Sequence, residues 1–304
     1  MVRLVATLSF SLICAMTVFA EPQPPKIEKL GTIDCDMVET TPVVFKGKLY
    51  RFEYVRGFYY KPNTTGDSYF RFVDTATGDY TPGFAKGFDL GSAYAEGDTM
   101  YAFGVDNWGG SKLSVFWSKD LATWESKVIL ELPGWEIFNN SVCKGPDGYV
   151  MAFEIGAPPE ETGSGFTSRF ARSKDLMNWE LTPAECVHRK DRYSACPAIH
   201  FLDGLYYMVY LEGHTNAYEP HITRSKDLIT WEDSPFQPIM RHSEEDKQIA
   251  NPKLTEEQRQ YIAGARNKNN SDFDFCEFNG KTVINYSWGN QEGKEFLAQA
   301  RYDG

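Results

Sequence analysis

The dominant pattern along the chain is a short apolar strand, a glycine turn and a second strand rich in tyrosine. It recurs five times, at intervals of about 50 residues for the first four copies and 76 residues for the last, with turns centred on Gly47, Gly97, Gly148, Gly204 and Gly280. Apolar and polar residues alternate on both sides of each glycine, which is typical of a β-hairpin. The pattern therefore predicts five hairpins, each forming the inner half of one repeat.

A second repeat has the pattern Ser-Lys-Asp-Leu-x-x-Trp-Glu. Its three copies span residues 118–125, 173–180 and 225–232, so they are 55 and 52 residues apart. Each copy lies between two alternating stretches, which predicts a hairpin between outer strands. The Asp can accept hydrogen bonds from backbone N–H groups two or three residues on, and the Trp is expected to cover the gap between neighbouring sheets. We interpret these turns as structural.

Five inner hairpins, three of them followed by an outer hairpin, predict an all-β fold: a five-bladed β-propeller of four-stranded antiparallel sheets. The last repeat is followed only by residues 295–302, which suffice for a third strand but not a fourth. Residues 26–33 have strand character and lack a partner of their own. We expect this segment to complete the last blade, which also removes two exposed sheet edges.

The first twenty residues have the features of an export signal. Arg3 supplies a positive start, residues 4–19 form an apolar run, and Ala20 ends a small-residue cleavage site. A membrane anchor is the competing interpretation, but the run is short and no second apolar stretch follows. The expected organisation is a signal peptide over 1–20 and a single propeller domain over 21–304, located outside the cell or in the periplasm.

Charge and cysteine content narrow the class of partner. The formal net charge is −11, and the Lys and Arg residues are scattered, which disfavours nucleic acid and membrane insertion. We expect a neutral oligosaccharide or polysaccharide as ligand, and a monomer. Five cysteines remain after residue 20, with no CxxC pair, so neither disulfide stapling nor a cysteine metal site is indicated. No cofactor is predicted, although a structural calcium ion remains an alternative.

Candidate site residues follow from the geometry of the hairpins. Positions eight residues before each turn glycine should lie at the end of the inner strand that faces the central funnel; they are Glu39, Asp89, Asn140, Cys196 and Asp272. Counting forward along the returning strands brings four polar residues to the same rim, with Glu154 slightly short of it; these four are Arg56, Asn107, Glu212 and Asn290.

Carboxylates crowded around one axis repel each other, so their presence needs a reason. Hydrolysis of a glycosidic bond supplies one, since one carboxylic acid protonates the departing oxygen and a second carboxylate activates water or attacks the anomeric carbon. The alternative for any single acid is that it caps a strand or pairs with Arg56.

The turns and hairpins together resemble the five-bladed propeller glycoside hydrolases, the group that contains families 43, 62, 32, 68, 117 and 130. The resemblance spans residues 21–304 and is carried by the Ser-Lys-Asp-Leu turns, by Ala195-Cys196-Pro197 and by residues 39–42. The resemblance implies an exo-acting glycosidase with an axial pocket. Most members of the group invert the configuration at the anomeric carbon, so an inverting mechanism is expected.

The chain departs from the pattern of this group at three places. Many members begin the first blade with Asp-Pro, where this chain has Thr41 before Pro42, so Glu39 is the proposed replacement. The third blade often carries a further Asp, where this chain has Asn140. Family 32-like proteins carry Glu-Cys-Pro in the fourth blade, but Ala195 stands at the Glu position here. The replacements considered for this general acid are Glu212, His214 and His221.

The fifth blade offers the strongest local cluster. Asp272 and Asp274 are expected on one strand face, with Trp288 and Asn290 returning beside them. This cluster is interpreted as a catalytic site or substrate clamp with Trp288 as a sugar platform; a calcium or turn-capping cluster is the alternative. The predicted catalytic residues are thus Glu39, Asp272 and Glu212, and the predicted substrate-binding residues are Arg56, Asp89, Asn107, Asn140, Glu154, His214, His221, Asp274, Trp288 and Asn290.

Two other functions remain open at this point. Thr41, Asn140 and Ala195 stand where relatives keep catalytic acids, which suggests a non-catalytic carbohydrate-binding propeller. A protein-interaction scaffold would instead carry large exposed apolar patches on the propeller face.

Overall fold

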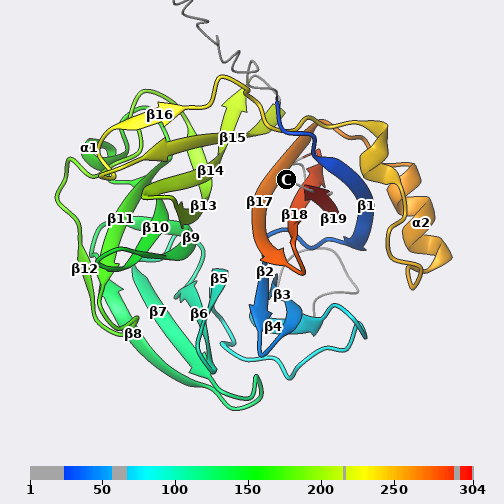
Figure 1. Ribbon diagram of the computed structural model, residues 1–304, viewed down its shortest axis with the longest axis horizontal. Coiled ribbons are helices and arrows are strands. Elements are labelled where there is room, and N and C mark those ends of the chain that lie inside the picture. The colour runs from blue at the N-terminus through cyan, green and yellow to red at the C-terminus, as the bar shows by residue number, and fades with distance from the viewer. Residues whose placement is uncertain (1–23, 57–66, 215–216, 291–294, 303–304) are drawn as a thin grey trace, which may run out of the picture.

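The strands of the computed structural model form five antiparallel sheets arranged in a ring (Figure 1). The described residues are 24–56, 67–214, 217–290 and 295–302. The predicted five-bladed β-propeller is confirmed. The predicted signal peptide, residues 1–20, lies outside the described residues. In the part of the chain that is described, no helix has the length and apolar character needed to cross a membrane.

The first three blades are each built from consecutive strands. The first contains β2 (Thr40–Phe45), β3 (Lys48–Val55) and β4 (Tyr69–Asp74). The second contains β5 (Asp89–Glu96), β6 (Thr99–Val105), β7 (Lys112–Ser118) and β8 (Glu125–Glu131). The third contains β9 (Glu136–Gly145), β10 (Gly148–Ala157), β11 (Thr167–Ser173) and β12 (Trp179–Leu181), with α1 (Pro159–Thr162) between β10 and β11.

The last two blades complete the ring. The fourth contains β13 (Ser194–Leu202), β14 (Leu205–His214), β15 (Ala217–Ser225) and β16 (Trp231–Asp233). The fifth contains β17 (Asn269–Phe278), β18 (Lys281–Gly289), β19 (Glu295–Tyr302) and β1 (Glu28–Cys35). The 3-10 helix η1 (Glu244–Lys247) and α2 (Glu256–Ala263) fill the longer interval between the fourth and fifth glycine turns.

Four sheets have four strands, whereas the first has three. The place of its fourth strand is taken by two isolated antiparallel bridges, Phe70 with Phe84 and Val73 with Tyr80. The chain therefore still returns along β4, but without a continuous ladder.

The ring closes through its N-terminal strand, as the sequence predicted. β1 pairs antiparallel with β19, so the sheet order of the last blade is β1-β19-β18-β17. Strands far apart in the sequence thus share one sheet, and β1 covers the edge that β19 would otherwise expose.

The three Ser-Lys-Asp-Leu turns join the third and fourth strands of their blades, and their structural interpretation is confirmed. In the third blade, for example, Asp175 Oδ1 accepts from the backbone N–H groups of Met177 and Asn178 at 2.9 and 2.8 Å. Each Trp packs on the preceding blade: Trp231 stacks on Phe170 with ring centroids 5.5 Å apart. The repeat therefore fastens neighbouring blades together.

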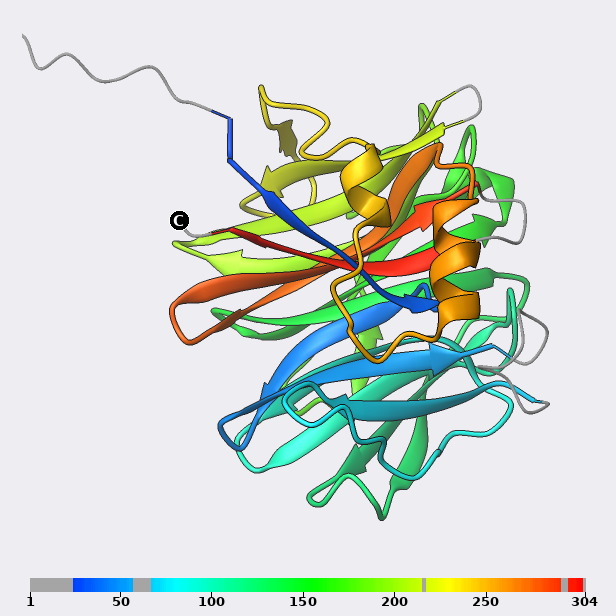
Figure 2. The same ribbon diagram turned by 90° about the vertical axis from the view of Figure 1, so that its right-hand side faces the viewer.

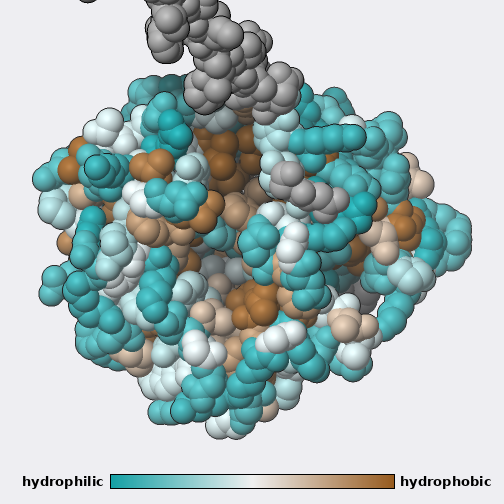
Figure 3. All heavy atoms as spheres, in the orientation of Figure 1, coloured by the Kyte–Doolittle hydropathy of each residue, from teal (hydrophilic) through white to brown (hydrophobic). Residues whose placement is uncertain are grey.

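The innermost strands β2, β5, β9, β13 and β17 run side by side around the axis. Their glycine turns lie on the left in Figure 2 and face the viewer in Figures 1 and 3, so the starts of these strands lie at the opposite end. On the face in Figure 3, apolar side chains gather around the centre of the ring, where all five innermost strands line a cavity of about 390 Å³.

Candidate functional site

The starts of the five innermost strands converge at one mouth on the axis. They line a small cavity of about 40 Å³ formed by Glu39, Thr40, Thr41, Gly91, Ser92, Asn139, Asn140, Cys196, Pro197, Ala198, Asp272, Phe273 and Asp274. This volume holds one or a few water molecules rather than a sugar ring. A ligand of the size of a sugar ring or larger would therefore sit above the cavity rather than inside it.

β9 shifts register between Ile137 and Asn140, and three other innermost strands carry a β-bulge near the level of this cavity. The register shifts between Asp89 and Ser92, between Ala195 and Ala198, and between Ser271 and Asp274. In each bulge a residue other than glycine has a positive φ: Leu90 at 52°, Cys196 at 49° and Asp272 at 47°. A bulge changes the direction in which side chains point. A left-handed residue other than glycine costs stability, so such residues are kept mainly where function requires them.

Glu39 precedes β2 and forms an ion pair with Arg56, which follows β3. Arg56 Nη2 lies 2.6 Å from both carboxylate oxygens of Glu39, and both side chains are buried. The Arg56 guanidinium also lies 3.8 Å from Glu295 at the start of β19. The sequence placed Glu39 and Arg56 side by side at the rim, and the structure confirms that placement.

Asp272 lies beside this ion pair and lines the axial cavity. Burial, together with the negative charges of Glu39 and Glu295, raises its pKa to about 8, although the charge of Arg56 acts in the opposite direction. At neutral pH the Asp272 carboxyl therefore holds its proton. The site therefore combines an ionised carboxylate, Glu39 paired with Arg56, and a neighbouring protonated carboxylic acid, Asp272. Acid–base catalysis needs one group of each kind.

Glu154 reaches the same region from β10. Its Oε2 accepts from the backbone N–H of Cys196 at 2.8 Å and from Asn139 Nδ2 at 3.2 Å. Burial raises its pKa to about 7, although these hydrogen bonds act in the opposite direction. Glu154 thus fixes the bulge that holds Cys196 and belongs to the floor of the site.

Asn140 and Asp89 hold the first three blades together at the mouth. Asn140 accepts from Ser92 Oγ at 2.6 Å and donates to the carbonyl of Leu90 at 2.9 Å. Asp89 is buried and accepts from the hydroxyl of Tyr54 at 2.6 Å. Asn140 lines the axial cavity. Asp89 does not line it; its carboxylate instead links the second blade to the first through Tyr54.

The prediction that Glu212 lies beside Cys196 is wrong. Because the bulge in β13 shifts the register, Glu212 lies opposite Ser194. Its carboxylate lies 3.2 Å from Arg192 Nη1 and 3.4 Å from Nδ1 of His221, away from the axial cavity. His221 lies on β15, two strands out from the axis, so it is also misplaced by the prediction.

The sugar platform predicted at Trp288 is also wrong. Its side chain is fully buried, its indole N–H donates to Thr32 Oγ1 at 2.8 Å, and its ring stacks on Phe296 at 4.4 Å. On β18, one strand out from the axis, this face points into the blade packing rather than into the funnel.

Four further predicted positions are distributed around the axis. Asp274 lines both the mouth cavity and the cavity on the glycine-turn face, and lies 3.5 Å from His200 Nε2. Asn107 is exposed in the loop after β6, and Asn290 directly follows β18. His214 ends β14, and its side chain lies outside the part that is described.

The structure adds an aromatic residue that the sequence analysis missed. Trp108 follows Asn107 and is 49% exposed, and the Arg56 guanidinium lies 5.8 Å from its ring centroid. Its ring also contacts Phe138 edge-on at 6.1 Å. Its adjacency to Asn107, one of the predicted rim residues, was the sequence signal that could have found it.

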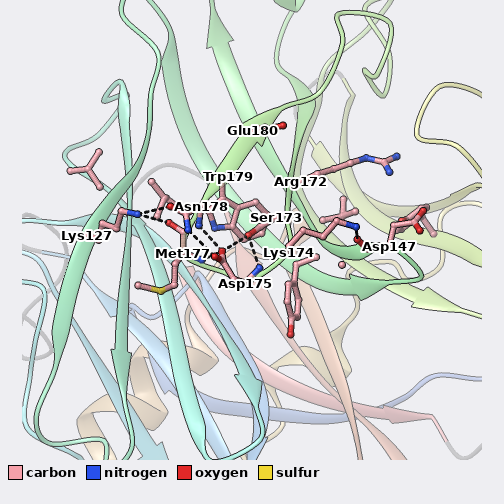
Figure 4. Close-up of a pocket in the computed structure, with 16 residues that line it drawn as sticks. Lys127, Asp147, Arg172, Ser173, Lys174, Asp175, Met177, Asn178, Trp179 and Glu180 are labelled. Carbon is pink, nitrogen blue, oxygen red and sulfur yellow. Dashed lines mark hydrogen bonds between the residues drawn. The ribbon is translucent and has the colours of Figure 1, made fainter.

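A larger groove of about 520 Å³ lies on the outside of the ring, between the second and third blades. Figure 4 shows that its polar side chains are largely engaged with one another: Lys127 donates to Asn178 at 2.8 Å, and Asn178 donates to Asp175 at 2.7 Å. This groove is lined by the Ser-Lys-Asp-Leu turn of the third blade, which we interpret as structural. We therefore place the candidate site at the smaller axial cavity, where the buried carboxyl groups gather.

The described residues contain no group of three or more His, Cys, Asp or Glu side chains arranged to hold a metal ion. The five cysteines of the described part are free thiols.

Comparison with known proteins gives the fold. No family model and no curated protein matches the chain. Solved structures that share the architecture include a glycoside hydrolase (14% identity, TM-score 0.64, covering 91% of this chain and 92% of that one) and a thermostable family-43 glycoside hydrolase (12%, 0.62, 89% and 90%). A family-32 β-fructofuranosidase from Bombyx mori is similar over 91% of this chain and 62% of its own (13%, 0.58). At these identities the likeness establishes the five-bladed fold.

Proposed function

We propose that the protein is a glycoside hydrolase that cleaves an O-glycosyl bond at the axial mouth. The observation that carries the proposal is the pairing, at one cavity, of Glu39 in an ion pair with Arg56 and Asp272 with a pKa raised to about 8. The fold shared with glycoside hydrolases supports it.

In this mechanism Asp272 is the general acid and Glu39 the general base. Asp272 gives its proton to the glycosidic oxygen as the bond to the anomeric carbon breaks. Glu39 takes a proton from a water in the axial cavity, and the resulting hydroxide oxygen bonds to the anomeric carbon. Net inversion follows, because water attacks from the side opposite the leaving group. Glu154 positions the floor of the site through Cys196.

The finer features of the proposal extend the sequence predictions. The protein acts on chain ends, because a cavity this narrow at the axis accepts a terminal sugar above it more readily than the middle of a polymer. It acts as a monomer, secreted or periplasmic after removal of residues 1–20.

A non-catalytic carbohydrate-binding propeller is the second candidate. It is favoured by Asn140 and Thr41 at the axial cavity, where the resembling families keep acids, and by the engagement of both Glu39 oxygens with Arg56.

The experiment that separates the two candidates is incubation of the purified protein with aryl glycosides and natural oligosaccharides, combined with calorimetry. A hydrolase releases sugar, and the anomer first formed, followed by NMR, reports inversion. An oligosaccharide that binds tightly and is recovered intact after days would establish the binder instead.

The exposed Trp108 beside Arg56 leads to a prediction about affinity. Replacement by Ala should raise KM for oligosaccharides about five- to tenfold while kcat changes little, because a stacking surface for the sugar is lost. Steady-state kinetics on oligosaccharides of increasing length would measure this. Leu202→Ala, which removes a 62% exposed side chain beside a glycine turn, is the matched control and should leave KM unchanged. An unchanged KM in Trp108→Ala contradicts the assignment.

A further inference from the structure

A cleft of about 420 Å³ lies on the outer wall of the ring, at the seam between the first and last blades. One side is formed by β1, β19 and the segment that leads into α2, and the other by β3, β4 and the turn after β4 (Figure 1). Among the described residues it shares no lining side chain with the axial cavity. Its volume lies within the range of about 300–1,000 Å³ typical of small-molecule sites.

Tyr80 stands at this cleft with 58% of its surface exposed. The guanidinium of Arg71 lies 4.0 Å from its ring centroid, and Arg71 Nε donates to the buried Glu53 at 2.7 Å. Arg51 Nε donates to the other oxygen of Glu53 at 2.7 Å. This chain of contacts supports the ring through Arg71, while more than half of the surface of Tyr80 stays exposed to solvent.

The polar lining of the cleft carries both signs of charge and several amides. Arg51 and Lys253 are cationic, Asp34 is acidic, and the amides are Asn251, Gln258 and Gln299. Such a mixture gives no preference for an anion or a cation. Each amide is hydrogen-bonded within the protein: Asn251 donates to the carbonyl of Ile33, Gln258 accepts from the backbone N–H of Thr255, and Gln299 donates to Asn285. These bonds use only part of each amide, so the rest is left for a ligand rich in hydroxyl groups, while Tyr80 offers an apolar surface to the C–H face of a sugar ring.

We propose that this cleft is a second carbohydrate-binding site, which takes a neutral oligosaccharide segment with Tyr80 as its stacking platform. The choice of ligand rests on the proposed function, since a glycan-acting protein meets the same polymer at both places. Binding on the outer wall would retain a polymer while its free end reaches the mouth.

The test is affinity electrophoresis of the full-length protein through gels that contain neutral soluble arabinan, xylan or laminarin. Three variants are compared with the wild type: Tyr80→Ala, Ala76→Leu and Asp272→Asn. Ala76 is exposed and lines the cleft, so a larger side chain there narrows the cleft without removing a core contact. Thermal unfolding of each variant accompanies the gels, and Ala76→Leu decides the matter where Tyr80→Ala lowers stability.

We expect at least one polymer to retard the wild type and Asp272→Asn equally, with about five- to tenfold weaker retention in Tyr80→Ala and Ala76→Leu. Hydrolysis of short aryl glycosides should be the same in Tyr80→Ala as in the wild type. Equal retention in all variants, or no retention by any of the polymers, overturns the second site. Cleft-dependent retention without any hydrolysis would instead overturn the proposed enzyme and leave this site standing.

Discussion

Asp272→Asn is expected to lower kcat on natural glycans by about 10²–10⁴-fold, because the amide has nearly the same shape but cannot deliver a proton to the leaving oxygen. The measurement is steady-state kinetics on two substrates that differ only in the leaving group. A dinitrophenyl glycoside needs no protonation on departure, so Asp272→Asn should cleave it at close to the rate of the wild type. Glu39→Gln should be impaired on both substrates, because activation of water is required in either case.

Glu212→Gln is the matched control for this experiment. Glu212 is also a buried carboxylate, but it is engaged with Arg192 and Tyr210 away from the axial cavity. Its kcat should stay within about threefold of the wild type, the size expected of an indirect effect. Equal losses on the two substrates in Asp272→Asn would remove Asp272 from the role of acid.

The raised pKa of Asp272 also fixes the direction of the pH dependence. Activity needs the protonated carboxyl, so kcat/KM should fall as pH rises through about 8. The folded protein favours the neutral form whereas the unfolded chain ionises near pH 4, so this group destabilises the fold increasingly between about pH 4 and 8. Asp272→Asn should therefore unfold at a temperature no lower than the wild type at pH 8. An alkaline limb near 8 that persists in the variant would assign it to another group.

The blades could be predicted from the sequence because their signals are local. A glycine turn between alternating strands, or an Asp that accepts from the next two N–H groups, needs only neighbouring residues to be recognised. Closure of the ring by β1 was also predictable, since the last repeat was one strand short. Glu39 and Arg56 were placed correctly because β2 and β3 pair without a bulge.

The site was predicted less well because it is where regular pairing is broken. A bulge inserts a residue without a clear mark in the sequence, and the bulge in β13 moved Glu212 away from Cys196. The prediction for Trp288 failed for a different reason: its side chain packs on Phe296 of β19 and Thr32 of β1 inside the fifth blade, and counting along β18 does not reveal this. The pKa of Asp272 depends on charges from β2 and β19, which come together only in the folded ring.

The closure of the ring depends on Asp246, a buried acid that was not predicted from the sequence. Asp246 of η1 is fully buried, and Lys29 of β1 lies 2.7 Å from its Oδ1. The hydroxyl of Tyr286 donates to Oδ1 at 2.8 Å, and Asn267 and Asn270 donate to Oδ2 at 2.7 and 3.2 Å. Three strands of the fifth blade, β1, β17 and β18, and the segment just before β17 therefore meet at one carboxylate of η1.

Asp246→Ala is expected to lower the free energy of unfolding by about 3–5 kcal/mol, because it leaves the Lys29 ammonium buried without a counter-charge. Urea denaturation measures the loss, and Glu245→Ala, an exposed acid one residue away, should change it by less than about 0.5 kcal/mol. Adding Lys29→Met to Asp246→Ala removes the uncompensated charge, so the double variant should regain part of the loss. A loss below about 1 kcal/mol in Asp246→Ala, or no recovery in the double variant, would mean that strand pairing between β1 and β19 closes the ring without help from this ion pair.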